Sequence, residues 1–302
     1  MKFKIISRYS LMLFLIMIIL ILLNMVFSEF EYSRFVNDEN KYLIEKSDNL
    51  IIGYTYPKNT TNVYGFKTNQ LGFVDQEHNI ESSSDYRILV IGDSVTAGLS
   101  FKSYAYFLEE ELNKESNFTY EVIIMAVEGY NTIQELEILE EWGLKFNPDI
   151  VILQFTYNDL EDFHIKQALS RFKIKIRNFK IWLKYDYCPD IDSGFIYDFN
   201  QEKFKLDCYL KRLNLYLEEF KDLSESYSFK PILLIHSYNN YNLNYISDLM
   251  YNISVKNDVD AITTINFMKP DFFSDTIHLN EKGNIELSKL LKVKINSIIN
   301  NN

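Results

Sequence analysis

The sequence is poor in the residues that mark several small or specialised protein classes. Its 302 residues include only 2 cysteines, 9 glycines and 5 prolines. Two cysteines are too few for a four-thiolate zinc site or a disulfide-rich scaffold, and so little proline and glycine excludes a fibrous or low-complexity chain. Basic residues are also in deficit, because 31 Lys and Arg face 42 Asp and Glu, for a net charge of −11. We therefore expect no nucleic-acid partner, because binding one needs a basic face that displaces phosphate counterions.

One long apolar run stands at the start of the chain. Lys2, Lys4 and Arg8 precede the uncharged stretch Leu11–Phe27, which as a helix would span about 26 Å, close to the hydrocarbon thickness of a bilayer. Because basic flanks stay in the cytoplasm, we expect residues 1–28 to be a transmembrane anchor with the rest of the chain extracytoplasmic. A cleaved signal peptide over the same residues, which would give a secreted protein, is the alternative.

An extracytoplasmic location bears on the two cysteines. Cys188 and Cys208 are twenty positions apart, and outside the cytoplasm they could form a disulfide. Two buried thiols remain the other interpretation.

The rest of the chain changes character at about residue 85. Residues 29–84 are predicted to form a polar stalk, helix-compatible as far as residue 49, and a small extension rich in turns. Residues 85–302 alternate short apolar runs with segments of helical spacing. The predicted strands are Tyr86–Ile91, Tyr120–Ala126, Asp149–Phe155, Pro231–Ile235 and Ala261–Phe267. The predicted helices are Ala97–Lys114, Ile133–Lys145, Leu206–Tyr227, Tyr241–Val255 and Glu281–Ile299.

This alternation defines the expected fold class. Buried strands joined by helices imply right-handed crossovers and a parallel sheet. We therefore expect an α/β fold, a three-layer α/β/α sandwich with a central parallel, flavodoxin-like sheet of about five strands, preceded by the transmembrane helix. In such sheets the functional site lies beyond the carboxyl ends of the strands.

Three of these strand ends carry residues suited to acyl transfer. The first strand runs into Gly92-Asp93-Ser94, which places a serine hydroxyl and a free backbone N–H at the start of a helix. Gly129 follows the second strand and can offer a backbone N–H at close approach. Asn158 follows the third strand, and its amide can donate a hydrogen bond to an oxyanion. Each residue alone has a simpler explanation as a helix cap or a turn residue.

A histidine and a carboxylate occur late in the chain. Asp275 precedes His278 by three residues, a spacing that lets the carboxylate hold one imidazole nitrogen while the other accepts a proton from a serine. Among the other histidines, His236 follows a strand and is the rival candidate for the base. We expect His78 and His164 to be surface residues.

The order of these blocks resembles the SGNH hydrolases, the GDSL-type esterase/lipase superfamily. That family has a Gly-Asp-Ser turn, a later glycine, an Asn-Asp pair and a final Asp-x-x-His. In this sequence they fall at Gly92–Ser94, Gly129, Asn158–Asp159 and Asp275–His278, and the resemblance spans about residues 85 to 295.

Three positions depart from the family pattern. Val95 stands where leucine is usual, and we expect it to pack inward without consequence. Thr156 replaces the usual glycine of the third block, which makes backbone approach there less easy. Ile124 occupies the place of an asparagine in the second strand and alters the support of the second block. None of these changes removes a catalytic group.

The resemblance implies a mechanism. Ser94 would be the nucleophile, His278 the general base, and Asp275 the residue that orients it. The oxyanion hole would consist of the N–H groups of Ser94 and Gly129 and the side chain of Asn158. The resemblance implies no metal and no organic cofactor.

The substrate is less well determined. Together with the expected location, the resemblance points to a serine esterase acting on acyl groups, O-acetyl above all, of a cell-envelope polysaccharide or glycan. A lipase or lysophospholipase acting on membrane lipid and an O-acyltransferase are alternatives. A non-catalytic surface binding module is the alternative from a different class.

A basic segment lies within an expected insertion at about residues 160–205. Residues 163–185 contain seven basic residues and no acid, with apolar residues at helical spacing. A contact with an anionic lipid or polymer through Lys173, Lys175 and Arg177 is one interpretation, and a solvated helix face is the other.

Overall fold

The structure, a computed structural model, describes residues 12, 14–27, 44–62, 64–114, 116–156, 159, 173, 176–177, 180–181, 203–239 and 244–300. Within them lies a five-stranded sheet whose strands all run parallel, in the order β4-β3-β5-β6-β7. The strands are β3 (Tyr86–Gly92), β4 (Tyr120–Ala126), β5 (Ile150–Phe155), β6 (Lys230–Ile235) and β7 (Asp260–Thr263). This is the flavodoxin-like order, so the expected α/β fold with a parallel sheet is confirmed.

The strands match their predicted positions because each is an apolar run buried on both faces. β7 is the exception, since it ends at Thr263 and not at Phe267. The N–H groups of Phe267 and Met268 both donate to the carbonyl of Thr264. This turn ends the strand, although the sequence there is still apolar.

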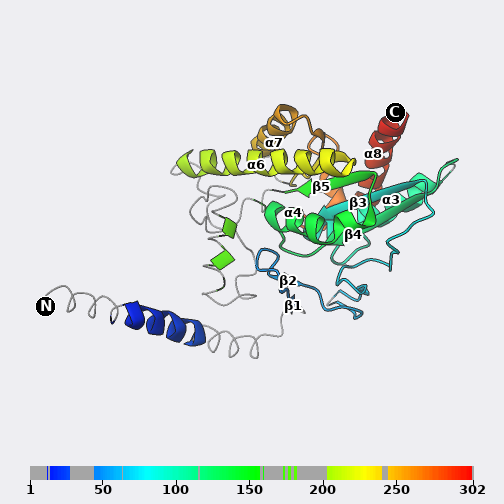
Figure 1. The fold of residues 1–302 in the computed structure, drawn as a ribbon. Coiled ribbons are helices and arrows are strands. Elements are labelled where there is room, and N and C mark those ends of the chain that lie inside the picture. The colour runs from blue at the N-terminus through cyan, green and yellow to red at the C-terminus, as the bar shows by residue number, and fades with distance from the viewer. Residues whose placement is uncertain are drawn as a thin grey trace, which may run out of the picture.

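Helices cover both faces of the sheet (Figure 1). One face packs against α4 (Thr132–Glu141), α6 (Lys203–Tyr227) and α7 (Asn244–Lys256). The other face packs against α2 (Ser94–Ala97), α3 (Tyr104–Asn113) and α8 (Glu281–Ile299). Short 3-10 turns, η1 (Gly143–Phe146) and η6 (Pro270–Phe272), follow α4 and precede α8. The result is a sheet sandwiched between two helical layers, each closed by its own hydrophobic cluster.

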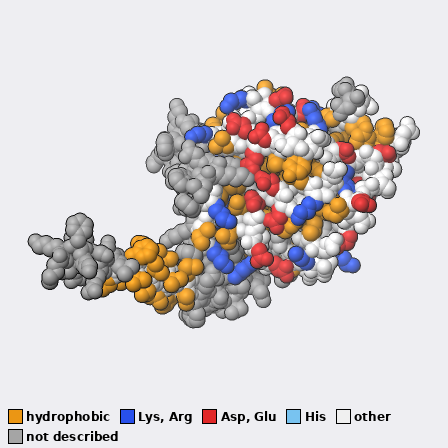
Figure 2. Space-filling model, viewed as in Figure 1, with side chains coloured by type: hydrophobic (Ala, Val, Ile, Leu, Met, Phe, Trp, Pro, Cys, Tyr) orange, Lys and Arg blue, Asp and Glu red, His pale blue; other side chains and the backbone are white. Residues whose placement is uncertain are grey.

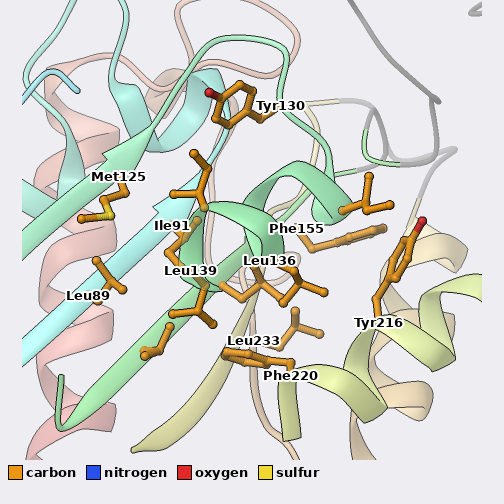
Figure 3. Close-up of a cluster of buried hydrophobic side chains, with 14 of the residues drawn as sticks. Leu89, Ile91, Met125, Tyr130, Leu136, Leu139, Phe155, Tyr216, Phe220 and Leu233 are labelled. Atoms are coloured by element: carbon orange, nitrogen blue, oxygen red, sulfur yellow. The ribbon is translucent and has the colours of Figure 1, made fainter. Parts of the chain in front are cut away.

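The larger cluster lies under α4 and α6. Figure 3 shows Leu136 and Leu139 of α4 and Phe220 of α6 packing over Leu89 and Leu233 of the sheet. All five side chains are completely buried. Burial of side chains of this size contributes about 1.5–3 kcal/mol each relative to exposure, so this face stabilises the strands whose ends carry the site.

The segment before the sheet contributes to the same cluster. The hairpin of β1 (Glu45–Lys46) and β2 (Tyr54–Thr55) is antiparallel, so the predicted helix-compatible stalk contains a short strand at its end. Ile52, Tyr54 and Phe73 are fully buried and belong to the cluster beneath α4. This extension therefore packs directly on the sheet.

The apolar run at the start of the chain is helical over its described residues, 14–27. Its hydrophobic side chains are largely exposed, and Figure 2 shows them as a continuous orange surface along the helix. Among the described residues, no helix is both long enough and apolar enough to cross a membrane.

Two of the sequence predictions fall outside the described residues. Cys188 is not described, and for Cys208 only the backbone, within α6, is described. The expected insertion at 160–205 is described at only a few positions.

Candidate active site

The site lies at the carboxyl end of the sheet, where the strand order reverses. β4, β3 and β5 are neighbours in the sheet, so the loops that follow them emerge along one edge. Those loops carry the glycine, the serine and the third block singled out in the sequence. The loop before α8 reaches the same edge, because Ser94 and His278 are in hydrogen-bond contact.

Ser94 is the first residue of the short helix α2 and is 6% exposed. Asp93 caps this helix, since one of its carboxylate oxygens accepts the N–H of Val95 at 2.8 Å. The N–H of Asp93 itself donates to the side-chain oxygen of Gln154 in β5, at 3.2 Å. The serine turn is thus held from both sides by buried polar groups. Val95 is buried, as expected from the sequence.

Asp275, His278 and Ser94 form one hydrogen-bonded chain. Asp275 Oδ2 lies 2.7 Å from His278 Nδ1, and His278 Nε2 lies 2.9 Å from Ser94 Oγ. Because the carboxylate only accepts, Nδ1 carries the proton and Nε2 is free to accept one from the serine. The geometry is that of a nucleophile, a base and an orienting acid.

The loop itself keeps Asp275 ionised and in place. Its Oδ1 accepts the N–H groups of Ile277 and His278, at 2.8 and 2.7 Å. Partial burial alone would raise the pKa of Asp275, but these N–H groups and the His278 ring outweigh it and hold the pKa below its ordinary value. The carboxylate is therefore negatively charged where it faces the imidazole.

Gly129 lies in the turn between β4 and α4 and has a φ of +75°. This left-handed conformation suits glycine and places the turn tightly over the strand end. Two tyrosines of the extension hold the residue before it: Tyr54 donates its hydroxyl to the carbonyl of Glu128 at 2.9 Å, and the N–H of Glu128 donates to Tyr56 Oη at 3.1 Å. Sequence reasoning missed both, because nothing local links residues more than seventy positions apart.

The third block is described in part. Asn158 lies outside the described residues, whereas Thr156 and Asp159 lie within them. The N–H of Thr156 donates to Asp159 Oδ2 at 2.6 Å, and its hydroxyl donates to Asp93 Oδ2 at 3.1 Å. The threonine that replaces the family's glycine therefore ties the third block to the serine turn.

Asp159 is buried at the base of the site together with two other carboxyl groups. It is 2% exposed, and Asp93 and Glu135 are fully buried. Burial, followed by the neighbouring charge of Asp93, raises the pKa of Asp159 well above its ordinary value. Burial and the charges of Asp159 and Asp93 raise the pKa of Glu135 in the same way, so the site disfavours the ionised form of both groups.

The other histidines do not contact Ser94 in the described residues. His236 is buried, with Nε2 at 2.8 Å from the carbonyl oxygen of Ile277, so it is not placed as the base. His164 lies outside the described residues. The prediction of a surface position is wrong for His78, which is buried between Asp75 and Glu121 because two carboxylates there satisfy both of its ring nitrogens.

The basic segment is also different from its prediction at one position. Arg177 is 1% exposed, and its Nε donates to the carbonyl of Ile51 at 3.2 Å. Both interpretations, the contact with an anionic surface and the solvated helix face, are therefore wrong for Arg177, because its guanidinium is used inside the protein. Lys173 is partly exposed, and Lys175 lies outside the described residues.

No metal-binding cluster is found in the part of the chain that the structure describes: no three or more His, Cys, Asp or Glu side chains there are arranged to hold an ion.

Comparison with known structures gives several similar folds. The acetyl xylan esterase AlAXEase is 17% identical, with a TM-score of 0.47 over 69% of this chain and 99% of its own. A lipase/acylhydrolase from Enterococcus faecalis is 16% identical, with a TM-score of 0.48 over 70% of this chain and 95% of its own. An acetylxylan esterase from Geobacillus stearothermophilus is 16% identical, with a TM-score of 0.43 over 69% of this chain and 93% of its own.

Curated protein sequences give no match. Comparison with protein families does: residues 90–180 match the GDSL-like lipase/acylhydrolase family. The matched segment begins within β3 and contains the Ser94 turn, Gly129 and the third block. Over this segment the chain is thus similar to the GDSL-like lipases and acylhydrolases, which are esterases of the SGNH type.

Proposed function

We propose that the protein is a serine esterase in which Ser94 is the nucleophile, His278 the general base and Asp275 the residue that orients the base. The observation that carries this proposal is the hydrogen-bonded chain from Asp275 Oδ2 through the imidazole to Ser94 Oγ, with distances of 2.7 and 2.9 Å. Both are hydrogen-bond distances, and the second is within the reach required for proton transfer from Ser94 to His278.

The reaction proceeds in two steps. Ser94 Oγ attacks the ester carbonyl carbon while His278 Nε2 takes its proton, and the tetrahedral intermediate collapses as the imidazolium returns that proton to the leaving alcohol. In the second step, His278 takes a proton from a water molecule as that water attacks the acyl-serine carbonyl. The imidazolium then returns this proton to Ser94 Oγ, and the carboxylic acid is released. Asp275 stabilises the imidazolium in both steps without taking its proton.

The oxyanion of each intermediate is held by the backbone N–H groups of Ser94 and Gly129 and by the side chain of Asn158. The sheet order supports this assignment, since the three loops follow neighbouring strands. Removal of one such donor generally costs about 10²–10³-fold in kcat.

We further propose that the substrate carries small acyl groups, O-acetyl above all, on a cell-envelope polysaccharide or glycan. The exposure of the loop that carries the proposed base favours a large carrier. The side chains of Asp275 and His278 are 52% and 25% exposed, so the site opens at the surface.

The proposed location is extracytoplasmic, with residues 1–28 as the anchor. The charged residues before the apolar run and the exposed hydrophobic side chains of the helical residues 14–27 support it. In host-cell fractions, the full chain should sediment with membranes, and a variant lacking residues 1–28 should not. Release of the intact full chain into the soluble fraction would contradict the anchor.

Replacement of Ser94 tests the mechanism. Ser94→Ala should lower kcat for p-nitrophenyl acetate by about 10⁴-fold or more, because no other hydroxyl replaces the nucleophile, and should abolish labelling by a fluorophosphonate probe. The control is Ser297→Ala, which removes an exposed hydroxyl that bonds only within α8. Unchanged activity or labelling in Ser94→Ala would refute the assignment, while failure to label the unmodified protein would favour a non-catalytic binding module.

The acyl group and acceptor need a separate experiment. We expect faster hydrolysis of p-nitrophenyl acetate than of the octanoate, and release of acetate from an O-acetylated polysaccharide. A preference for the octanoate would favour the lipase alternative. Transfer of acetyl to an added sugar, in place of release into water, would favour the acyltransferase.

A further inference from the structure

His236 stands directly after β6 and points at the loop that carries the proposed base. Its Nε2 lies 2.8 Å from the carbonyl oxygen of Ile277, the residue before His278. A carbonyl oxygen only accepts hydrogen bonds, so Nε2 must carry a proton. The ring also lies against Phe273 at the start of the same loop, with centroids 5.9 Å apart.

The other ring nitrogen shows that this histidine is neutral and costly to bury. Nδ1 is buried and has no hydrogen-bond partner among the residues that the structure describes. Desolvation lowers the pKa of His236 to about 4, against the smaller opposing effects of the Ile277 carbonyl and Asp93. The bond made by Nε2 is therefore accompanied by the desolvation cost of Nδ1, which no described residue pairs. An apolar side chain would fill the same space without that cost.

The hydrogen bond from His236 holds the carbonyl of the Ile277–His278 peptide, which sets the position of His278. The Ile277 N–H donates to Asp275 Oδ1 on one side of the loop, and the Ile277 carbonyl accepts from His236 on the other. One further tether joins the same two segments, from the N–H of Asn239 to the carbonyl of Thr276, at 3.0 Å. The loop is thus fixed against the end of β6 at the two residues that precede His278.

We propose that His236 is a positioning residue for the ester-cleaving reaction: it holds the Ile277–His278 peptide so that the His278 ring stays within reach of Ser94. This inference rests on the proposed function, because it assigns His236 a role through His278. His236 contacts neither the serine nor the substrate, and it is neutral when His278 becomes an imidazolium, so it adds no charge that would oppose that step.

The experiment compares two substitutions in the full chain. His236→Gln keeps an N–H donor, since the Gln side-chain nitrogen lies the same number of bonds from Cα as Nε2, whereas His236→Leu fills the space without a donor. For p-nitrophenyl acetate, we expect His236→Leu to lower kcat about tenfold or more with KM within about twofold, and His236→Gln to stay within about threefold of the unmodified protein. Saturating fluorophosphonate labelling should slow in parallel with kcat.

Ile235→Ala is the matched control, because Ile235 is a buried neighbour in β6 that belongs to the cluster on the opposite face of the sheet. It should lower the melting temperature with little effect on kcat. If kcat of the two His236 variants instead follows their melting temperatures, with Gln no better than Leu, the role is merely structural and the inference fails. Unchanged kcat in His236→Leu also overturns it, whereas an inactive, unlabelled parent protein would overturn the proposed function itself.

Discussion

At the scale of single residues, the two carboxylate oxygens of Asp275 have different hydrogen-bond partners. Oδ1 accepts two backbone N–H groups of its own loop, and Oδ2 faces His278 Nδ1. The first oxygen shapes the loop and the second selects the tautomer of the ring. A substitution that changes only Oδ2 should therefore leave the loop conformation intact while it alters the interaction with the His278 ring.

Asp275→Asn is that substitution. With Oδ1 retained on the backbone N–H groups, the new NH₂ group faces Nδ1 and favours the tautomer that has its proton on Nε2. That nitrogen could then no longer accept from Ser94, so we expect kcat to fall by about 10³–10⁴-fold with the fold unchanged. Steady-state kinetics and circular dichroism measure the two effects.

Asp271→Asn serves as the comparison, since Asp271 is an exposed carboxylate near the same loop that pairs with Lys282. The Asp271→Asn variant should have the kcat of the unmodified protein. An Asp275→Asn variant as active as Asp271→Asn would show that the carboxylate is not needed to orient His278.

At the scale of elements, the serine helix is short because the chain turns back directly after it. The sequence predicts one helix over 97–114, but α2 ends at Ala97 and α3 begins at Tyr104. Gly98 caps α2 in the left-handed conformation, with a φ of +82°, and its N–H donates to the carbonyl of Ser94. Glycine stops the helix at this point because it adopts this conformation at no steric cost.

Gly98→Ala should therefore disturb the site more than an equivalent change elsewhere. A Cβ at Gly98 would meet the carbonyl of Phe101 and lie 2.7 Å from the N–H nitrogen of Ser103, whereas at Gly65, with a φ of +87°, it would meet nothing within 4 Å. We expect Gly65→Ala to cost about 1 kcal/mol of unfolding free energy, and Gly98→Ala more than about 2 kcal/mol with reduced kcat. Urea unfolding measures the difference, and equal costs would contradict this explanation.

At the scale of the whole molecule, α3 and the extension before the sheet together cover the edge formed by β4. β4 is an edge strand, and the outward N–H groups of Val122 and Ile124 donate to Glu109 and Asp75, each at 2.7 Å. Carboxylates that accept these N–H groups prevent pairing with another strand. Ile124, at the place where the family pattern has asparagine, is thus held through its backbone.

His78 links this edge to the sheet and makes stability depend on pH. Its two nitrogens lie 3.0 Å from Asp75 and 2.7 Å from Glu121, so the ring donates on both sides and is protonated. Burial alone would lower its pKa, but the two carboxylates outweigh this and raise it from 6.5 to about 9. The stabilisation is therefore complete below pH 6.5 and is lost as the pH rises through about 9.

We expect this loss to be about 2 kcal/mol of unfolding free energy. Urea unfolding between about pH 6 and about pH 10 measures it, with His78→Gln as the control that does not titrate. The unmodified protein should lose more stability than the variant over this range. Identical pH profiles would show that the His78 pair contributes nothing to the pH dependence.

Much of the fold was predictable because it depends on local patterns. The apolar runs of β3 to β6 lie within one residue of their predicted bounds, and α8 has the bounds predicted for it. The Ser94, Gly129 and Asp275–His278 segments were found by their order along the chain and their places after strands. Burial of His78 and Arg177 was not predictable, because it depends on Glu121 and Ile51, which lie 43 and 126 positions away.

The sequence by itself thus determined the alternation of strands and helices and the residue types that can carry acyl transfer, because periodicity and side-chain chemistry are properties of short segments. Only the tertiary structure decided which groups meet: that His278 and not His236 faces Ser94, that Tyr54 and Tyr56 hold the Gly129 turn, and that Thr156 bonds Asp93. These contacts join residues distant in the chain, and they arise only when the packed sheet brings its loops to one edge.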